Sequence, residues 1–376
     1  MNDRDLYRCA TPFLAALAAL TLVAGCASTG MGPASTPTAS TTEGPLARPS
    51  SGWRVGTLEH VDLWLHGFAL LTNDTGRVPY FARDYKQKIA VIKRQRNLYT
   101  QLDANQPSLS ARFATNPGLT NAQFVAMYFP SFQEIVNATD QFIRANGNPR
   151  GASDAQMQQE IALLAGNFPT PADRDWLRLF VQSLQDENNR FYDAYWSNEQ
   201  QMRTAALSAF REAWMSRYYQ KLSRFLNNTQ QSAGQLVLSL PLGGEGRTIN
   251  DGKQANMIAV NFPTTAEAAP EAIYTFVHEA VSRLVEEAIR DNTTPAEQRS
   301  GASLGYSGNG AVRAGALLLQ RVSPELVPGY VHYYLRTGGI TSQRGDPSTA
   351  FVAGFPIPTA ILTAVSRQID VVLGGI

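Results

Sequence analysis

The sequence predicts an α+β fold in which helices dominate, and three observations carry this prediction. Between residues 84 and 229, apolar side chains recur at the spacing of amphipathic helices. Two short apolar segments, 236–240 and 257–262, have the length and composition of strands. From residue 270 onward the helical pattern returns. Helices followed by strands and then by more helices, with no internal repeat, are typical of α+β rather than alternating α/β folds.

The N-terminus has the pattern of a secretory signal. Arg4 and Arg8 precede an apolar run from Phe13 to Ala24. This run is shorter than the roughly 20 apolar residues that a membrane-spanning helix needs. Basic residues, a short apolar run and then small residues together indicate a signal peptide that is removed from the mature protein.

The end of this run, Val23-Ala24-Gly25-Cys26, resembles the lipobox of bacterial lipoproteins. The resemblance implies that residues 1–25 are a lipoprotein signal peptide and that Cys26 is lipidated and anchors the protein to the membrane of the bacterial envelope. Ala27 follows the cysteine where some lipoproteins carry aspartate, which implies the outer membrane, on its periplasmic side. The alternative is an ordinary signal peptide whose cleavage site lies beside a cysteine.

Residues 26–52 form the expected tether. They are rich in Ser, Thr, Pro and Gly and contain almost no large apolar side chain, so they bury too little surface to fold. We expect a flexible spacer between the lipidated cysteine and a single globular, helix-rich domain over residues 53–376.

Charge and cysteine content exclude some functions for this protein. The chain has a net charge of +1, and charged residues make up 17% of it, so no nucleic-acid partner is expected. Its two cysteines are Cys9 and Cys26, which leaves the globular domain without a thiol for catalysis or metal binding. Residues 86–96 carry five cations, which either contact anionic lipid near the anchor or form a solvated helix face.

The remaining elements follow in chain order. Residues 61–71 are apolar and form either a buried strand or a short helix, because periodicity alone does not separate the two. Thr170 and Pro171 mark a helix start. The aromatic residues of 172–229 recur at helical spacing, which favours a core face over a ligand cage. The expected helices are 84–104, 120–145, 153–166, 172–198, 199–229, 270–290, 311–337 and 357–373, and the two strands are expected to pair antiparallel.

His278 and Glu279, on the expected helix 270–290, are the candidate catalytic pair. In H-E-x-x-H metallopeptidases, two histidines one helical turn apart hold zinc, and the glutamate is the general base toward the metal-bound water. Ser282 stands at the position of the second histidine, and a serine hydroxyl is a poor zinc ligand. His278 also has a structural interpretation, as a buried histidine that is hydrogen-bonded to a neighbour.

The surroundings of this pair resemble the gluzincin zinc metallopeptidases, and in particular a family of uncharacterised bacterial envelope proteins with that domain. The resemblance rests on a helix-rich region, on two strands of which the second ends in Asn261-Phe262-Pro263, and on the helix that bears His278. It covers roughly residues 60–335 in layout, is specific around 257–290, and implies a gluzincin-like core of about residues 230–335. It implies that the strand over 257–262 forms a sheet edge on which an extended peptide pairs.

The resemblance also implies a third metal ligand, a glutamate three residues before a Val-Arg-Ala triplet. The triplet here is Val312-Arg313-Ala314, and Asn309 stands at the ligand position. Ser282 and Asn309 are therefore degenerate ligand positions, and His278 and Glu279 are left as the metal-ligand and general-base candidates. Glu286 lies about 12 Å along the helix from His278 and is too distant to share a metal with it. Glu325 and His332 remain as alternative ligands.

Three functional hypotheses result. The first is a membrane-anchored, catalytically degenerate metallopeptidase-like domain that holds no cofactor and binds a peptide or an envelope protein. The second is an active zinc peptidase with unconventional ligands. The third is a helical envelope scaffold without enzymatic activity.

Overall fold

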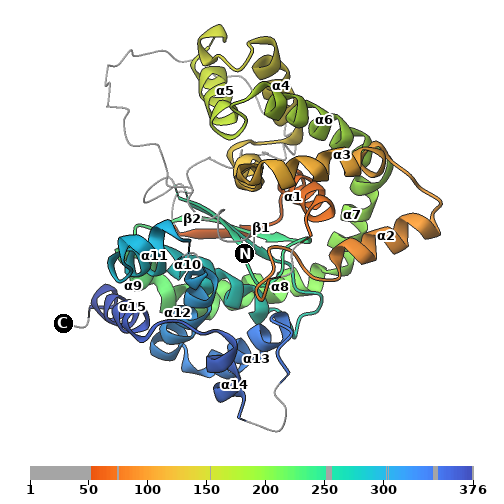
Figure 1. Ribbon diagram of the computed structural model, residues 1–376. Coiled ribbons are helices and arrows are strands. Elements are labelled where there is room, and N and C mark those ends of the chain that lie inside the picture. Colours follow the sequence, from red (N-terminus) through yellow and green to blue (C-terminus); the bar gives the residue numbers. More distant parts are fainter. Residues whose placement is uncertain are drawn as a thin grey trace, which may run out of the picture.

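The computed structural model describes residues 52–73, 76–152, 154–250, 256–301, 303, 305–341 and 346–374. It confirms a helix-dominant α+β fold with one small mixed sheet (Figure 1). The expected signal peptide, Cys26 and the expected tether up to residue 51 lie outside the described residues.

The sheet has four strands in the order β1-β2-β4-β3. The strands are β1 (Trp53–Gly56), β2 (Gly234–Ser239), β3 (Arg247–Asn250) and β4 (Asn256–Asn261). The strands β1, β2 and β4 are mutually parallel, and β3 pairs antiparallel with β4 at one edge.

The expectation of an antiparallel pair over 236–240 and 257–262 is therefore wrong, because β2 and β4 are parallel neighbours. The chain between them turns back through the additional strand β3. All of β4 and most of β2 are buried. Continuous apolar runs of this kind are typical of parallel strands covered on both faces.

Helices make up most of the remaining chain. The α-helices are α1 (Glu59–Leu71), α2 (Tyr85–Gln95), α3 (Gln101–Thr115), α4 (Phe132–Arg144), α5 (Ala155–Asn167), α6 (Pro171–Glu187), α7 (Asp193–Met202), α8 (Thr204–Ala213), α9 (Tyr219–Asn228), α10 (Pro270–Asp291), α11 (Pro295–Arg299), α12 (Tyr306–Val322), α13 (Val327–Thr337), α14 (Pro347–Gly354) and α15 (Thr359–Val372). The 3₁₀ segments are η2 (Pro117–Tyr128), η3 (Pro149–Gly151) and η6 (Pro324–Leu326), and the π-helical segments are η4 (Asn188–Tyr192) and η5 (Trp214–Tyr218).

Most of the expected helices exist, but several are divided. The expected helix 84–104 breaks after α2, where Asn97 adopts a φ of 49°. The expected helix 311–337 breaks at Ser323, before Pro324, because proline cannot continue the hydrogen-bond ladder. The segment 61–71 is helical. The helix start at Thr170 is confirmed, since its side chain caps α6 in a capping box with Asp173.

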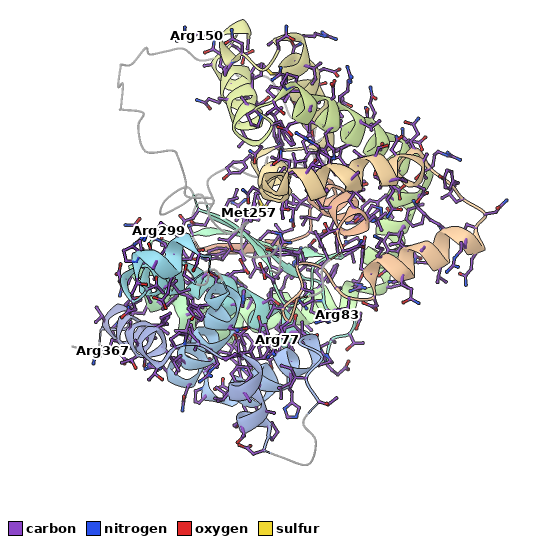
Figure 2. All side chains as sticks on the ribbon, in the orientation of Figure 1. Arg77, Arg83, Arg150, Met257, Arg299 and Arg367 are labelled. Atoms are coloured by element: carbon purple, nitrogen blue, oxygen red, sulfur yellow. The ribbon has the colours of Figure 1, made fainter. Side chains whose placement is uncertain are left out.

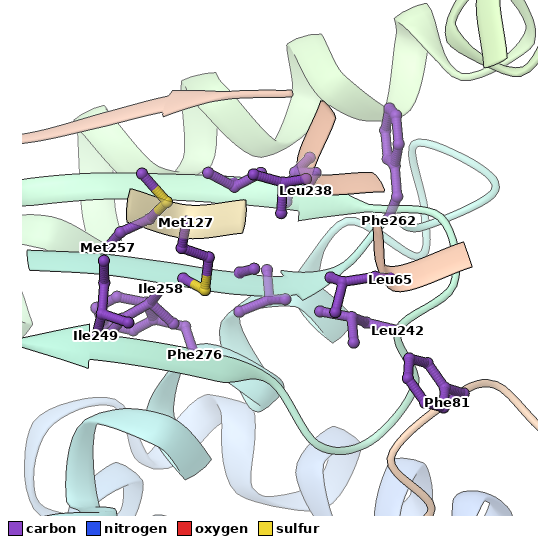
Figure 3. Packing of buried hydrophobic residues seen from close by; sticks show 14 of the residues in the cluster. Leu65, Phe81, Met127, Leu238, Leu242, Ile249, Met257, Ile258, Phe262 and Phe276 are labelled. Carbon is purple, nitrogen blue, oxygen red and sulfur yellow. The ribbon is translucent and has the colours of Figure 1, made fainter. Parts of the chain in front are cut away.

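The sheet lies between two groups of helices (Figure 1). Helices α3 to α6 form the upper group in that view, and α10 and α12 to α15 form the lower group. Figure 3 shows Met127 of η2 close to Met257 of β4 on the sheet. Both side chains are almost completely buried, as is Phe276 of α10.

The aromatic residues of 172–229 belong to the core, as predicted. Trp214, for example, is completely buried and packs edge-on against Phe276 at a centroid distance of 4.8 Å. Trp196 and Tyr219 are only partly buried but pack against the same core.

The cationic segment 86–96 is not a uniform solvated face. Lys93 is 4% exposed and lies between Glu187 and Asp103, and Lys88 pairs with Glu199. Exposed cations are instead spread over the molecule, with Arg150, Arg299 and Arg367 labelled at widely separated places in Figure 2.

No single helix of the described part is long and apolar enough to cross a membrane. The consecutive helices α14 and α15 pass such a test only as a pair, and they are bent by 110° at the break between them.

Candidate functional site

His278 and Glu279 lie on α10, directly beneath the antiparallel edge of the sheet. The His278 side chain is completely buried, and its Nδ1 lies 2.9 Å from Oε1 of Glu279. Because an ionised carboxylate only accepts hydrogen bonds, Nδ1 donates. The other ring nitrogen, Nε2, has no hydrogen-bond partner among the described residues. The imidazole stacks on the ring of Tyr334 of α13 at 5.9 Å.

The Glu279 carboxylate fastens the edge of the sheet to α10. Its Oε1 accepts a hydrogen bond from the Gly246 amide at 2.9 Å, and its Oε2 accepts one from the Thr248 hydroxyl at 2.8 Å. Both carboxylate oxygens therefore bind the protein's own chain, and the side chain is only about 8% exposed.

The segment Leu240–Gly246, here named the covering loop, is held against the same helices along its length. The Tyr333 hydroxyl donates to the Gly243 carbonyl at 3.1 Å, and the Tyr334 hydroxyl donates to the Gly244 carbonyl at 2.9 Å. At Gly246 a Cβ atom would lie 2.6 Å from Cγ of Glu279, so only glycine allows this close approach.

The strand at the sheet edge next to the His278–Glu279 pair is not the one that was expected. The segment 257–262 was expected to form the sheet edge, but β4 is an inner strand, and β3 forms the edge. Among the described residues no further strand pairs with β3 on its outer side.

Ser282 and Asn309, where the sequence resemblance implies lost metal ligands, bond backbone carbonyls in the structure. The Ser282 hydroxyl donates to the backbone carbonyl of His278 at 2.8 Å, within its own helix. The Asn309 side chain donates to the carbonyl of Pro356 at 3.0 Å. Neither residue forms a hydrogen bond with the His278 ring.

The alternative ligands also lie elsewhere. His332 bonds the Pro328 carbonyl of its own helix at 3.0 Å, and Glu325 forms a surface ion pair with Lys221 at 2.6 Å. Within the described ranges, no group of three or more His, Cys, Asp or Glu side chains is arranged to hold a metal ion. A catalytic zinc needs three protein ligands, and the donor set around His278 does not fit it.

A second buried polar cluster escaped the sequence analysis. His66 of α1 binds the Tyr85 hydroxyl through Nδ1 at 2.9 Å and Glu187 through Nε2 at 3.0 Å. Glu187 also accepts from Lys93 at 2.7 Å and from Thr100. Although burial opposes its ionisation, the bonds from His66 and Lys93 prevail and lower the pKa of Glu187 to about 2. Burial lowers the pKa of His66.

Asp62, one helical turn before His66, is completely buried. Its Oδ2 accepts from the Trp196 indole at 3.0 Å and from the Leu240 amide at 3.4 Å. Burial raises the pKa of Asp62 to about 7, although Ser239, Trp196, the Leu240 amide and the Arg203 charge act in the opposite direction. The signal in the sequence was the presence of Asp62 and His66 in the stretch 61–71 of α1, which is otherwise free of polar side chains.

A cavity of about 270 Å³ lies between the end of α1 and the start of α2. Its lining includes Phe81, Tyr85 and Lys86, but neither His278 nor Glu279. The cavity is thus separate from the candidate pair.

Comparison with protein-family models, with curated proteins and with solved structures finds no significant match to this chain. The geometry and the sequence patterns are therefore the basis for a functional proposal.

Proposed function

We propose that this protein is a lipid-anchored lipoprotein of the bacterial envelope whose globular part is a catalytically inactive, gluzincin-like domain that binds an extended peptide segment of another protein. The lipobox-like Val23-Ala24-Gly25-Cys26 supports the anchor. The observation that carries the binding function is the position of the Glu279 carboxylate, which fixes the edge strand β3 through Gly246 and Thr248.

An extended peptide adds to a sheet at an edge strand. Strand β3 has β4 on one side and no described strand on the other. A peptide added there would pair with the strand that Glu279 fastens to α10, and not with the segment 257–262 that the resemblance implied. A rigid edge lowers the entropic cost of pairing, because the protein side of the new ladder is already ordered.

The hydrogen bonds of the motif residues support the loss of catalysis. A general base must reach the proton that it abstracts, whereas both oxygens of Glu279 accept from the covering loop and from β3. Ser282 and Asn309 stand where two metal ligands are expected and bond backbone carbonyls.

The test combines metal content, hydrolysis and binding. The mature chain is purified without chelator, beside a His278→Ala variant, and zinc is measured. A reduced, carboxymethylated and fluorescently labelled polypeptide then serves as an unfolded probe. We expect no stoichiometric zinc, no cleavage of the probe, and a rise in probe anisotropy on binding.

Two matched variants test whether the probe binds at β3. Thr248→Val removes the hydroxyl that fastens this strand and should weaken probe binding several-fold. Glu287→Gln alters a carboxylate on the same helix that pairs with Arg283, and it should leave binding unchanged. Zinc that disappears in His278→Ala, together with cleavage that a chelator abolishes, would establish an active peptidase instead. Failure to bind the probe at any pH would favour the scaffold hypothesis.

A further inference from the structure

The covering loop begins at a buried acid. Leu240 is its first residue, and the Leu240 amide donates to Oδ2 of Asp62 at 3.4 Å. The same oxygen accepts from the Trp196 indole at 3.0 Å, so Asp62 joins α1, α7 and the end of β2. The other oxygen, Oδ1, has no hydrogen-bond partner at bonding geometry among the described residues, although the Ser239 hydroxyl lies near enough to favour the ionised carboxylate.

Among the ion pairs of the described residues, none joins a cation to this carboxylate. The charge that acts on it is that of Arg203, whose Nε and Nη2 bind Glu199 at 3.0 and 2.9 Å. Arg203 also donates to the Phe262 carbonyl. A completely buried carboxylate without a direct ion pair is costly in its ionised form.

The titratable and charged groups that face Asp62 come from several elements. Burial raises the pKa values of Tyr85 of α2, Tyr192 of η4 and Tyr195 of α7, so these phenols stay neutral near neutral pH. Burial lowers the pKa of His66, one turn along α1. The remaining charge that acts on Asp62 is that of Arg203.

We propose that Asp62 is a proton-controlled anchor that holds the covering loop closed over the His278–Glu279 pair and releases it on ionisation. In the protonated acid, Oδ1 carries the proton, and Oδ2 accepts from Trp196 and Leu240. The ionised acid needs water at Oδ1, because a buried charge is costly without hydration. Ionisation therefore favours a locally open state in which Leu240, the first residue of the covering loop, separates from α1.

The direction of the pH effect follows from linkage. In a hydrated, open state Asp62 has an ordinary pKa of 3.8, and in the closed state its pKa is about 7. The closed state therefore binds the proton more tightly, and rising pH favours opening. Opening should increase by up to tenfold per pH unit between about pH 4 and 7 and should level off above pH 7.

This inference rests on the proposed function for its biological meaning, because the loop is taken to control access to the peptide site. Its mechanism needs no peptide, so the two can fail separately. In an envelope that follows external pH, such an anchor would make the site more accessible at neutral than at acidic pH.

The experiment is hydrogen–deuterium exchange of the whole mature chain, followed on fragments that cover 236–250 from pH 4.5 to 8.5 and corrected for the intrinsic exchange rate. In the wild type, loop protection should fall as the pH rises to about 7 and then stay constant. Asp62→Asn, which cannot ionise, should remove this pH dependence. The control Asp175→Asn, at a side chain that is 68% exposed on α6, should keep it.

A flat wild-type profile, or a profile that Asp62→Asn leaves unchanged, would overturn the proposal. If Asp62→Asn does not fold, Trp196→Phe decides the matter. This variant removes one donor to the ionised carboxylate, so the plateau should begin at higher pH, and an unshifted plateau contradicts the anchor. Loop opening with the expected profile, but without binding of the unfolded probe at any pH, would refute the peptide function and leave the anchor standing.

Discussion

The hydroxyl of Thr248 lies 2.8 Å from Oε2 of Glu279 and ties the edge strand β3 to the central helix α10. This bond crosses from the sheet to the helix that bears the candidate pair. It explains why a polar side chain on β3 faces the helix layer, while its neighbours Arg247 and Ile249 are buried on the other face.

We expect Thr248→Val to destabilise the protein by about 1–2 kcal/mol, because a hydrogen bond to a charged acceptor is lost and the carboxylate keeps little access to water. The free energy of unfolding, measured in urea, checks this. Thr204→Val is the control, since Thr204 is exposed and bonds only the backbone of the preceding turn. Equal losses in the two variants would show that the Thr248 bond has no special role.

Gly315 of α12 lies against the side chain of Tyr330 of α13. A Cβ atom there would lie 2.2 Å from the hydroxyl oxygen of Tyr330, which itself donates to the Val312 carbonyl at 2.9 Å. Gly315→Ala must displace a completely buried tyrosine, and we expect a loss of about 2–3 kcal/mol.

Gly308→Ala is the matched control on the same helix. Nothing lies within 4 Å of a Cβ atom at Gly308. Alanine is the better helix former by about 1 kcal/mol, so this variant should be as stable as the wild type or more stable. Thermal unfolding of both variants tests the pair. A stable Gly315→Ala protein would mean that α13 can move away from α12 at little cost.

The fold class and most helices were predictable from sequence because they depend on local periodicity and capping. The capping box of Thr170 and Asp173 is encoded within four residues and was recognised as a helix start. The short strand β3 was not recognised, because four residues carry no periodic signal and its position depends on pairing with β4. The expected helix 84–104 covers only the first four residues of α3, which continues through Pro107 to Thr115.

The candidate site was predictable only in part. His278 and Glu279 form a visible pair, but their partners Gly246, Thr248 and Tyr334 come from segments more than 30 residues away. The His66–Glu187 bond joins residues that are 121 positions apart. Contacts of this kind are set by how the layers pack, and no local pattern encodes them.

Glu187 should make the protein sensitive to acid. Its pKa in the fold is about 2, below the ordinary 4.5, so its ionised form stabilises the fold above about pH 4.5, and this stability is lost as the pH falls toward 2. The shift of about 2.5 units corresponds to roughly 3 kcal/mol. Glu187→Gln leaves Lys93 with a single carboxylate partner, Asp103, and should cost about 3–5 kcal/mol at pH 7.

Urea unfolding between pH 2.5 and 7 measures this effect. The difference in stability between wild type and Glu187→Gln should shrink as the pH falls, because the wild type loses its ionised carboxylate while the variant has none to lose. Glu297→Gln, at an exposed cap of α11, should follow the wild type at all pH values above 4.5. A constant difference would mean that the Glu187 carboxylate acts by shape and not by charge.

Asp62 should change the stability of the protein with pH in the direction opposite to Glu187. Its pKa in the fold is about 7, above the ordinary 3.8, so the fold is most stable relative to the unfolded chain when this acid is protonated. Stability is then lost as the pH rises from about 4 to about 7, by up to about 4 kcal/mol for a shift of three units.

Asp62→Asn cannot ionise. It should be no more stable than the wild type at pH 4.5, where its amide hydrogens need acceptors that the acid does not, and more stable at pH 8. Crossing of the two stability curves between these pH values is the expected result, and parallel curves would show that the buried carboxylate does not titrate within the fold. Because the Glu187 effect appears below pH 4.5 and the Asp62 effect mainly above pH 4, each single variant should lose one region of the pH profile, and the double variant should lose both.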